Sequence, residues 1–261
     1  MLQFTHVTKT FHPGTPDAKT ALNDISLHIH PGDFVTIIGA NGAGKSTLFN
    51  AIAGDFITDR GQILLDGHDI TLSPSYRRAK QIGRLFQDPM RGSAPGMTVE
   101  ENLALAAGRG GWLSFLPKSA KKKYRERVAL LEMGLEDRMN QPVGLLSGGQ
   151  RQALTLMMAT LNTPKILLLD EHTAALDPGT AEKVLHLTQA IVKDHHLTCL
   201  MITHNMQSAL DLGNRTLMMH QGRVIMDISG EERKALSVAD LLLKFKETSG
   251  QALNNDRMLL T

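Results

Sequence analysis

The chain has 261 residues, a hydrophobic content of 42% and a formal net charge of +2. This length accommodates one large domain or a domain with an inserted lobe, and the low charge gives no general attraction to nucleic acid or to an anionic membrane. The single cysteine, Cys199, lies in an apolar run, which favours a residue of the core. One cysteine excludes an internal disulfide, which is compatible with a reducing compartment. No apolar stretch approaches the roughly 20 residues of a spanning helix, and Met1–His6 does not resemble a secretion signal. We therefore expect a soluble protein, which leaves a membrane-bound partner open.

The first 36 residues predict β-structure. Apolar and polar residues alternate at 3–7 and again at 25–29, and Pro31-Gly32-Asp33 marks a turn after the second run. A polar loop rich in proline and glycine, at about 13–19, separates the two runs. Two strands are therefore expected before this turn.

A glycine-rich motif follows a short apolar run. Residues 39–47 match the phosphate-loop pattern G-x-x-x-x-G-K-[ST] in full. The run 33–38 predicts a buried strand, and 46–53 predicts a helix ended by Gly54. Glycines between a strand and a helix let the backbone wrap a phosphate, and the N–H groups at the helix start attract its charge. The residues expected to contact a nucleotide here are Gly39, Ala40, Asn41, Gly42, Ala43, Gly44, Lys45, Ser46 and Thr47.

The same pattern assigns roles to two of these side chains. Lys45 is expected to reach the β- and γ-phosphates, and the Ser46 hydroxyl is expected to bind Mg²⁺. The alternative is a glycine-rich turn without a ligand. Motif and surrounding elements agree, which favours the nucleotide interpretation.

A further β signal lies at 61–70, where Asp66-Gly67 is a hairpin-turn dipeptide. We expect a small antiparallel sheet beside the nucleotide-binding core. From about 88 to 158 the pattern turns helical.

Two helices are predicted in this helical region. Thr98-x-x-Glu101 is a capping box for a helix through Leu105, and 118–133 predicts a second helix that Gly134 stops. The second helix starts with a cluster of lysines and arginines, which favours a solvated face over a nucleic-acid patch because the net charge is low. Gly110-Gly111-Trp112 between them is expected to be a loop, and no role is assigned to it.

The α/β pattern resumes after residue 158. The tail from Gly250 is polar and is expected to be loosely held. The predicted elements are a buried strand at 165–170, a helix at 180–193, a strand at 198–203, two strands at 217–220 and 223–226 around Gln221-Gly222, and a last helix at 237–246.

Chemistry-bearing residues follow two of these strands. Ligands of open parallel sheets bind beyond the carboxyl ends of the strands. Asp170, after four apolar residues, resembles the aspartate of P-loop enzymes that holds Mg²⁺. Glu171 is suited to orient or deprotonate an attacking water, or else stabilises the next helix as an N-terminal acid. His204 is suited to donate a hydrogen bond to a transferred phosphoryl group, or else is structural.

The segment Leu146-Ser147-Gly148-Gly149-Gln150, called the signature segment below, indicates which class of phosphate-loop protein this chain belongs to. Ser147-x-x-Gln150 is a capping box for the apolar helix at 153–159, which explains the segment locally. A capping box does not require two adjacent glycines, however. The Gly148-Gly149 pair would expose backbone amides at a positive helix end and make a second anion site. Two such loops in one chain favour a pair of chains, each closing the nucleotide held by the other.

The order of these motifs resembles the nucleotide-binding subunits of ABC transporters over nearly the whole chain. By this resemblance Gln87, in Leu85-Phe86-Gln87-Asp88, would touch Mg²⁺ and the attacking water and would couple the site to a membrane subunit. Asp177, in Ala175-Leu176-Asp177, would contact the opposite subunit, and His204 resembles the switch histidine. Phe11 resembles the aromatic residue that stacks on adenine, with an ordinary core residue as the alternative.

One position departs from the family pattern. Most relatives have proline after the catalytic glutamate, and this chain has His172, which loosens a backbone constraint next to the base or else is a neutral variant. Together with Asp88-Pro89-Met90 and 94–98, this feature resembles a bacterial subgroup linked to uptake of aromatic amino acids such as tryptophan or tyrosine.

The resemblance implies an α/β fold of the P-loop NTPase type, with a RecA-like core, an antiparallel β-lobe and an inserted helical lobe. Residues 1–261 are expected to form a single ABC ATPase domain. The core and β-lobe would comprise about 1–87 and 159–230, the helical lobe about 88–158, and a C-terminal helix and tail about 231–261.

The resemblance also implies ATP and Mg²⁺ as cofactors, and an ATP-dependent dimer that hydrolyses ATP to drive uptake of a small solute such as an amino acid. The expected partners are transmembrane permease subunits and an extracellular solute-binding protein, without nucleic acid, at the cytoplasmic face of the cell membrane. A permease-docking groove is expected around 87–102, with Met90, Pro95 and Met97 exposed. An exporter subunit, a soluble ABC ATPase of translation or DNA repair, and a small-molecule kinase stay open as alternatives.

Overall fold

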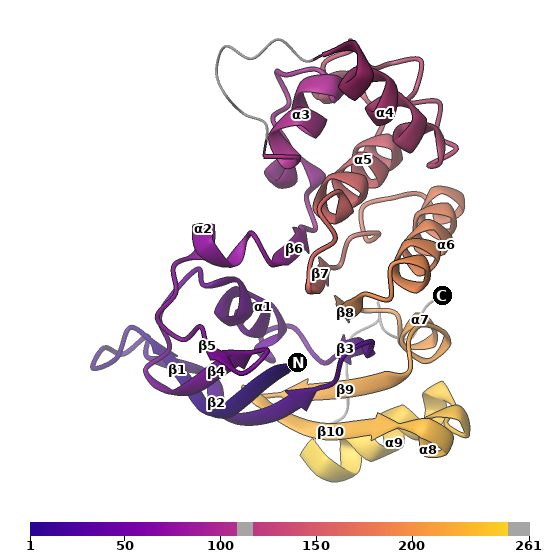
Figure 1. The fold of residues 1–261 in the computed structure, drawn as a ribbon. Helices are drawn as coiled ribbons and strands as arrows, with labels where there is room; N and C mark the ends of the chain where they lie inside the picture. Colours follow the sequence, from indigo (N-terminus) through magenta and orange to yellow (C-terminus); the bar gives the residue numbers. More distant parts are fainter. Residues whose placement is uncertain (109–116, 250–261) are drawn as a thin grey trace. The chain divides into compact units, whose positions relative to one another are not determined.

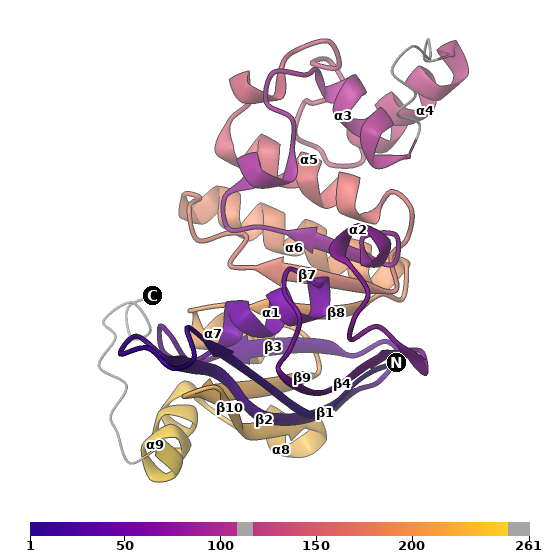
Figure 2. The ribbon, with the colours of Figure 1, turned by 90° about the vertical axis from the view of Figure 1, so that its left-hand side faces the viewer.

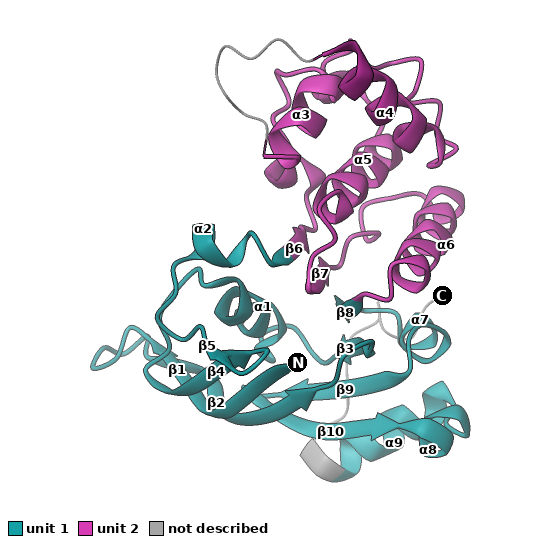
Figure 3. Ribbon diagram, viewed as in Figure 1, with its two compact units in different colours: residues 1–82, 198–261 teal, residues 83–197 magenta. Residues whose placement is uncertain are grey.

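A computed structural model describes residues 1–108 and 117–249, in the element order of Figure 1. The chain forms two compact units: unit 1 comprises 1–82 and 198–261, and unit 2 comprises 83–197 (Figure 3). The predicted loop at Gly110–Trp112 and the tail from Gly250 lie outside the described residues. Among the helices that are described, none is long and apolar enough to cross a membrane.

Unit 1 contains the predicted antiparallel sheet, in the strand order β2-β1-β4-β5. Leu65 is opposite His68, so Asp66 and Gly67 form a two-residue hairpin turn. Their φ angles are 50° and 76°, the left-handed values that a type I′ turn requires, which confirms the predicted hairpin. The strands are β1 (Leu2–Phe11), β2 (Lys19–Ile29), β4 (Arg60–Leu65) and β5 (His68–Asp69).

A second set of strands in unit 1 runs in the order β10-β9-β3-β8. The central strand β3 (Phe34–Ile38) is parallel to both β8 (Thr198–Ile202) and β9 (Arg215–His220), and β10 (Arg223–Ser229) is antiparallel to β9. Every residue of β3 and β8 is buried, as expected for apolar, β-branched strands covered on both faces. Cys199 lies in β8, where burial raises the thiol pKa, so its prediction as a core residue is confirmed.

Short helices cover this second set of strands. Figures 1 and 2 show α8 and α9 beside β10. Phe245 of α9 packs with Ile38, Met218 and Ile228 in one buried cluster, which explains why the last helix is amphipathic. The helices of unit 1 are α1 (Lys45–Ala53), α2 (Ser75–Arg78), α7 (Met206–Asp211), α8 (Gly230–Lys234) and α9 (Val238–Ser249).

Unit 2 joins two neighbouring strands to a helical cluster. Tyr124 and Val128 of α4 pack with Leu103 of α3 and Leu154 of α5 in one buried core. The predicted helical lobe at about 88–158 falls within this unit, which also contains β7, α6 and all but the first residue of β6. The elements are β6 (Ile82–Leu85), β7 (Ile166–Asp170), α3 (Val99–Ala106), α4 (Lys118–Ala129), α5 (Gly148–Thr160), α6 (Pro178–Asp194) and the 3-10 turns η1 (Pro89–Gly92) and η2 (Val143–Leu145).

Helix α4 differs from its prediction at the C-terminal end. It ends at Ala129 instead of 133, because Leu131 and Glu132 donate to carbonyls three residues back and the backbone of Glu132 turns left-handed, with φ of 53°. Its basic face carries ion pairs within unit 2, including Lys121 with Glu100 at 2.5 Å and Arg125 with Asp137 at 2.8 Å. These pairs support the interpretation as a solvated helix face.

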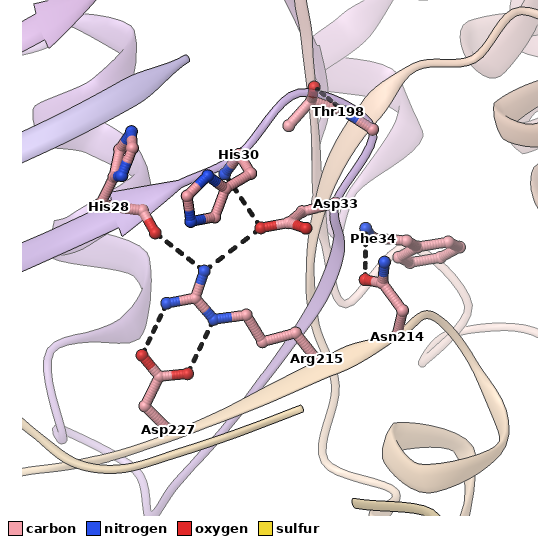
Figure 4. Close-up of polar contacts among 9 residues, drawn as sticks. His28, His30, Asp33, Phe34, Thr198, Asn214, Arg215 and Asp227 are labelled. Carbon is pink, nitrogen blue, oxygen red and sulfur yellow. Dashed lines mark hydrogen bonds and ion pairs between the residues drawn. The ribbon is translucent and has the colours of Figure 1, made fainter. Parts of the chain in front are cut away.

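An ion-pair network holds the start of β9 in unit 1 (Figure 4). Arg215 donates to both oxygens of Asp227 at 2.7 and 2.6 Å, to Asp33 Oδ2 at 3.2 Å and to the His28 carbonyl at 2.8 Å. The pKa of Arg215 is raised, first by its hydrogen bonds to Asp227. One guanidinium therefore ties β9 to β10, to β2 and to the turn before β3.

Arg215→Met is expected to lower the free energy of unfolding by about 2 kcal/mol, because it leaves two carboxylates without their shared cation. Chemical denaturation monitored by circular dichroism measures the change. Arg60→Met, on an exposed position of β4, is the matched control and should shift stability by no more than about 0.5 kcal/mol. Equal effects of the two substitutions would contradict a stabilising role for the network.

Candidate functional site

The phosphate loop joins β3 to α1 in unit 1. Gly44 occupies the N-cap of α1 with φ of 106°, and a Cβ built there would stand 2.5 Å from the Ala21 carbonyl oxygen. A side chain is therefore excluded both by conformation and by space. No side chain caps the helix at this position, and first-turn amides of an α-helix have no intrahelical acceptor. The local geometry is that of an anion site.

Lys45 points back over this loop. Its ammonium donates to the carbonyl oxygens of Gly39 at 2.7 Å and Ala40 at 3.1 Å, and the residue is only 5% exposed. Ala43 N–H also donates to the Ala40 carbonyl, at 3.1 Å, which closes the turn. Ser46, the next residue, is exposed. The Lys45 ammonium is thus held beside the phosphate loop, and the exposed Ser46 hydroxyl follows it in the chain.

One end of the antiparallel sheet reaches the same loop. Phe11 is opposite Lys19 across β1 and β2, and a Cβ built on Gly42 would stand 3.3 Å from Lys19 Nζ. The Phe11 ring is half-buried and meets Phe56 edge-on, with ring centroids 5.5 Å apart. Phe11 is therefore not a fully buried core residue, and its role at adenine stays a prediction. The sequence did not indicate Lys19, because a lysine after a polar loop matches no motif.

His204 lies at the same sheet edge as the phosphate loop. Strand β8 runs parallel to β3 with Ile202 opposite Ile37, and the Thr203 amide donates to the Ile37 carbonyl at 3.2 Å. Asn205 then caps α7 by accepting from the Ser208 amide at 2.7 Å. This cap fixes the chain just after the half-buried His204. Its role toward a phosphoryl group stays a prediction.

The second group of predicted residues lies in unit 2. Asp170 is the last residue of β7, and Glu171 follows it with a left-handed φ of 46°. Such a backbone conformation is uncommon for a residue with a side chain and marks a position that its neighbours must hold. The Glu171 carbonyl accepts from the Ala174 amide at 3.0 Å, so the chain turns sharply after the strand.

Gln87 follows β6, the neighbour of β7, and is exposed. The preceding residue, Phe86, has the Arg84 and Arg91 guanidinium groups 4.5 and 5.0 Å from its ring centroid. The following residue, Asp88, caps η1 by accepting from the Met90 amide at 2.9 Å. Gln87 is therefore an exposed amide between two locally anchored residues.

The signature segment forms the capping box that the sequence predicted. Ser147 Oγ accepts from the Gln150 amide at 3.3 Å, and the Ser147 amide donates to Gln150 Oε1 at 3.1 Å. The structure adds a second reason for glycine, because a Cβ on Gly149 would stand 2.1 Å from Thr180 Cγ2 on α6. Packing of α5 on α6 thus requires Gly149 independently of any ligand, while Ser147 stays exposed.

Asp177 is the N-cap of α6 and is also exposed. Its Oδ1 accepts from the Thr180 amide at 3.0 Å, and hydrogen bonds from the Thr180 side chain and amide lower the Asp177 pKa. The residue therefore has a local role as an N-cap. Contact with an opposite subunit stays a prediction.

The predicted docking segment is only partly exposed. Met90 is exposed, as predicted, whereas Pro95 and Met97 are half-buried, so the prediction for these two residues was wrong. The physical reason is Asn102, whose side-chain amide donates to the carbonyls of Ala94 and Thr98 at 3.0 and 2.9 Å and holds the loop against α3.

A phosphate loop between a buried parallel strand and a helix defines a P-loop nucleotide-binding protein of the α/β class. The family model described as ABC transporter matches residues 22–174, and the chain belongs to this family.

Relatives and solved structures agree with this assignment. The chain is 44% identical over 249 residues to a tyrosine transport ATP-binding protein of Clostridioides difficile (strain R20291), covering 94% of this chain and 99% of that relative. It is 37% identical to the methionine import ATP-binding protein MetN 1 of Staphylococcus aureus (strain MRSA252), covering 86% of this chain and 64% of that relative. A dimeric post-hydrolysis structure of the ATP-binding cassette MJ0796, bound to ADP and Pi, superimposes with a TM-score of 0.75 at 29% identity, covering 88% and 98% of the two chains. The chain is an ATP-hydrolysing, ATP-binding subunit of an ABC transporter with the P-loop NTPase fold.

Proposed function

We propose that this subunit drives import of an amino acid, and that tyrosine or a related aromatic amino acid is the solute. The observation that carries the proposal is the near full-length match, at 44% identity, to a tyrosine transport ATP-binding protein. The match to a methionine import protein supports the broader class of amino acid importers. The exporter, translation or repair, and kinase alternatives have no observation in their favour.

The site residues divide into two groups in this proposal. In unit 1, the amides of the phosphate loop and Lys45 hold the phosphates of ATP, Phe11 contacts the adenine, and His204 contacts the transferred phosphoryl group. Lys19 adds a positive charge beside the loop. In unit 2, Glu171 takes a proton from the attacking water.

Mg²⁺ fits the chemistry of three proposed donors. The Ser46 hydroxyl, the Asp170 carboxylate and the Gln87 amide oxygen are hard oxygen ligands, which this cation prefers. When bound, the ion would neutralise charge that develops on the phosphate oxygens.

Two copies complete the site in this proposal. Ser147, Gly148, Gly149 and Gln150 of one copy would close over the ATP held by the phosphate loop of the other, with Asp177 at the same interface. Because nucleotide then forms much of the interface, dimerisation should depend on ATP. Hydrolysis would weaken the interface and release the pair.

The proposed partners are membrane permease subunits and an extracellular solute-binding protein. The subunit would act at the cytoplasmic face of the membrane. The exposed side chain of Met90, which closely follows Gln87 in the sequence, is the proposed point of contact with the permease. This position would connect the permease directly to the segment that holds a magnesium ligand.

Reconstitution tests the solute assignment. The subunit, purified with its permease, is placed in lipid vesicles with the solute-binding protein and ATP, and uptake of labelled tyrosine and methionine is compared. We expect ATP-dependent tyrosine uptake at least about tenfold above methionine uptake, because a binding site built for the tyrosine hydroxyl and ring rejects an analogue without them. Equal uptake, or uptake of methionine alone, would contradict the assignment.

A further inference from the structure

A buried histidine follows the strained Glu171. His172 is 3% exposed, and its Nε2 atom lies 3.2 Å from Oγ1 of Thr188, which is 1% exposed and lies in the middle of α6. The segment that follows β7 is therefore attached to α6 by a polar contact inside unit 2. A buried polar contact of this kind is costly to break, because each group would be left without its partner.

The direction of this hydrogen bond follows from the threonine. Thr188 Oγ1 lies 2.8 Å from the Val184 carbonyl oxygen, which cannot donate, so the single hydroxyl proton is donated there. The threonine oxygen must then accept from His172, which places the imidazole proton on Nε2. Burial lowers the pKa of His172 to about 4, but the direction of the bond follows from the threonine geometry alone.

The His172–Thr188 hydrogen bond lies next to a residue whose backbone conformation must be stabilised by its surroundings. Glu171 has a left-handed φ of 46° and is flanked by the last residue of β7 on one side and by His172 on the other. The turn bond from Ala174 to the Glu171 carbonyl holds the same segment. Strand β7 holds the chain before Glu171. The His172–Thr188 bond attaches the chain after Glu171 to helix α6.

We propose that His172 and Thr188 are positioning residues for ATP hydrolysis, and that their hydrogen bond holds Glu171 where its carboxylate meets the attacking water. This inference rests on the proposed role of Glu171 as the general base. His172 and Thr188 are buried and are not among the proposed nucleotide contacts, so loss of their bond should slow the chemical step without weakening ATP binding.

Thr188→Val tests the proposal, because it keeps the shape of the side chain and removes the acceptor. In steady-state ATPase assays of the full chain we expect kcat to fall about tenfold with KM for ATP unchanged, since a small displacement of a catalytic group is costly. Thr188→Ser keeps the acceptor and should retain nearly full activity. Thr160→Val is the matched control, because Thr160 is a buried helical threonine whose hydroxyl, among the described residues, bonds the carbonyls of Leu156 and Met157.

The histidine side of the bond is tested in the same assay. His172→Met removes the donor and should match Thr188→Val, whereas His172→Gln offers an amide N–H and should restore most of kcat. The double variant His172→Met, Thr188→Val should be no slower than either single variant, because both remove one interaction. If His172→Met does not fold, the comparison of Thr188→Val, Thr188→Ser and Thr160→Val decides whether the proposal holds.

Three outcomes would overturn the inference. They are equal kcat in Thr188→Val and Thr160→Val, a rise in KM in place of a fall in kcat, and a Thr188→Ser variant as slow as Thr188→Val. A different result would show that Glu171 is not the general base. In that case Glu171→Gln would hydrolyse ATP as fast as the wild-type chain.

Discussion

Glu171→Gln is expected to lower ATP turnover by a factor of about 100 to 1,000, because glutamine keeps the shape and polarity of the side chain but takes no proton from water. ATP binding should be unchanged, since the phosphate loop in unit 1 is untouched. The variant should also accumulate as an ATP-bound dimer, because the event proposed to open the dimer no longer occurs. Phosphate release and size-exclusion chromatography with ATP measure the two effects.

The control for this variant is Glu182→Gln, which makes the same change on the exposed surface of α6. The Glu182 side chain is 75% exposed and its nearest ion-pair partner, His186, is 3.7 Å away. Turnover should therefore stay at the wild-type level. Retained turnover in Glu171→Gln, or an ATP-bound dimer in the Glu182 variant as well, would contradict the assigned role.

Gly149→Ala is expected to lower the free energy of unfolding by about 3 kcal/mol, at the upper end for overpacking, because its Cβ would lie 2.1 Å from Thr180 Cγ2. Thr180→Ser removes that methyl group, and the next atoms, Thr180 Cβ and Met133 Cε, lie at 3.6 and 3.8 Å. The double variant should therefore recover the wild-type stability. Thermal or chemical denaturation of the single and double variants checks this result.

Gly148→Ala is the matched control in the same segment. Its Cβ would lie 3.3 Å from Leu176 Cδ2, the end of a side chain that can rotate away, so the change should stay within about 1 kcal/mol. If Gly149→Ala were equally destabilising with serine at 180, the clash with α6 would not be the cause.

Much of the local structure followed from the sequence because it depends on neighbours in the chain. The Asp66-Gly67 hairpin, the capping boxes at Thr98 and Ser147, and the Gly54 helix stop are all present. Each uses hydrogen bonds or dihedral angles within about five residues, so residue type alone carries the information. The helix at 118–133 was predicted too long, because after Ala129 the amides donate to carbonyls three residues back and the backbone of Glu132 turns left-handed.

The sequence predicted some residues of the candidate site and missed others. The phosphate loop and the strand-end positions of Asp170, Glu171 and His204 were found from pattern, and the structure places each at the end of a buried strand. Lys19 was missed, because its position beside Gly42 depends on the pairing of β1 with β2. Pro95 and Met97 were predicted as exposed, and only the structure shows why they are not: Asn102 bonds the loop locally, and the Gly144 and Val143 amides donate to the Pro95 and Met97 carbonyls at 2.9 Å.

The sequence by itself determined the class of this protein, since the ordered phosphate loop, signature segment and strand-end acids need no coordinates to be recognised. Only the tertiary structure showed that Gly149 is required by α6, that Arg215 ties four segments together, and that His172 is bonded to Thr188. The physical reason is the range of the forces involved. A motif is specified by residues within a few positions of each other, whereas steric clashes and tertiary hydrogen bonds join residues that are 16 to 187 positions apart in the chain.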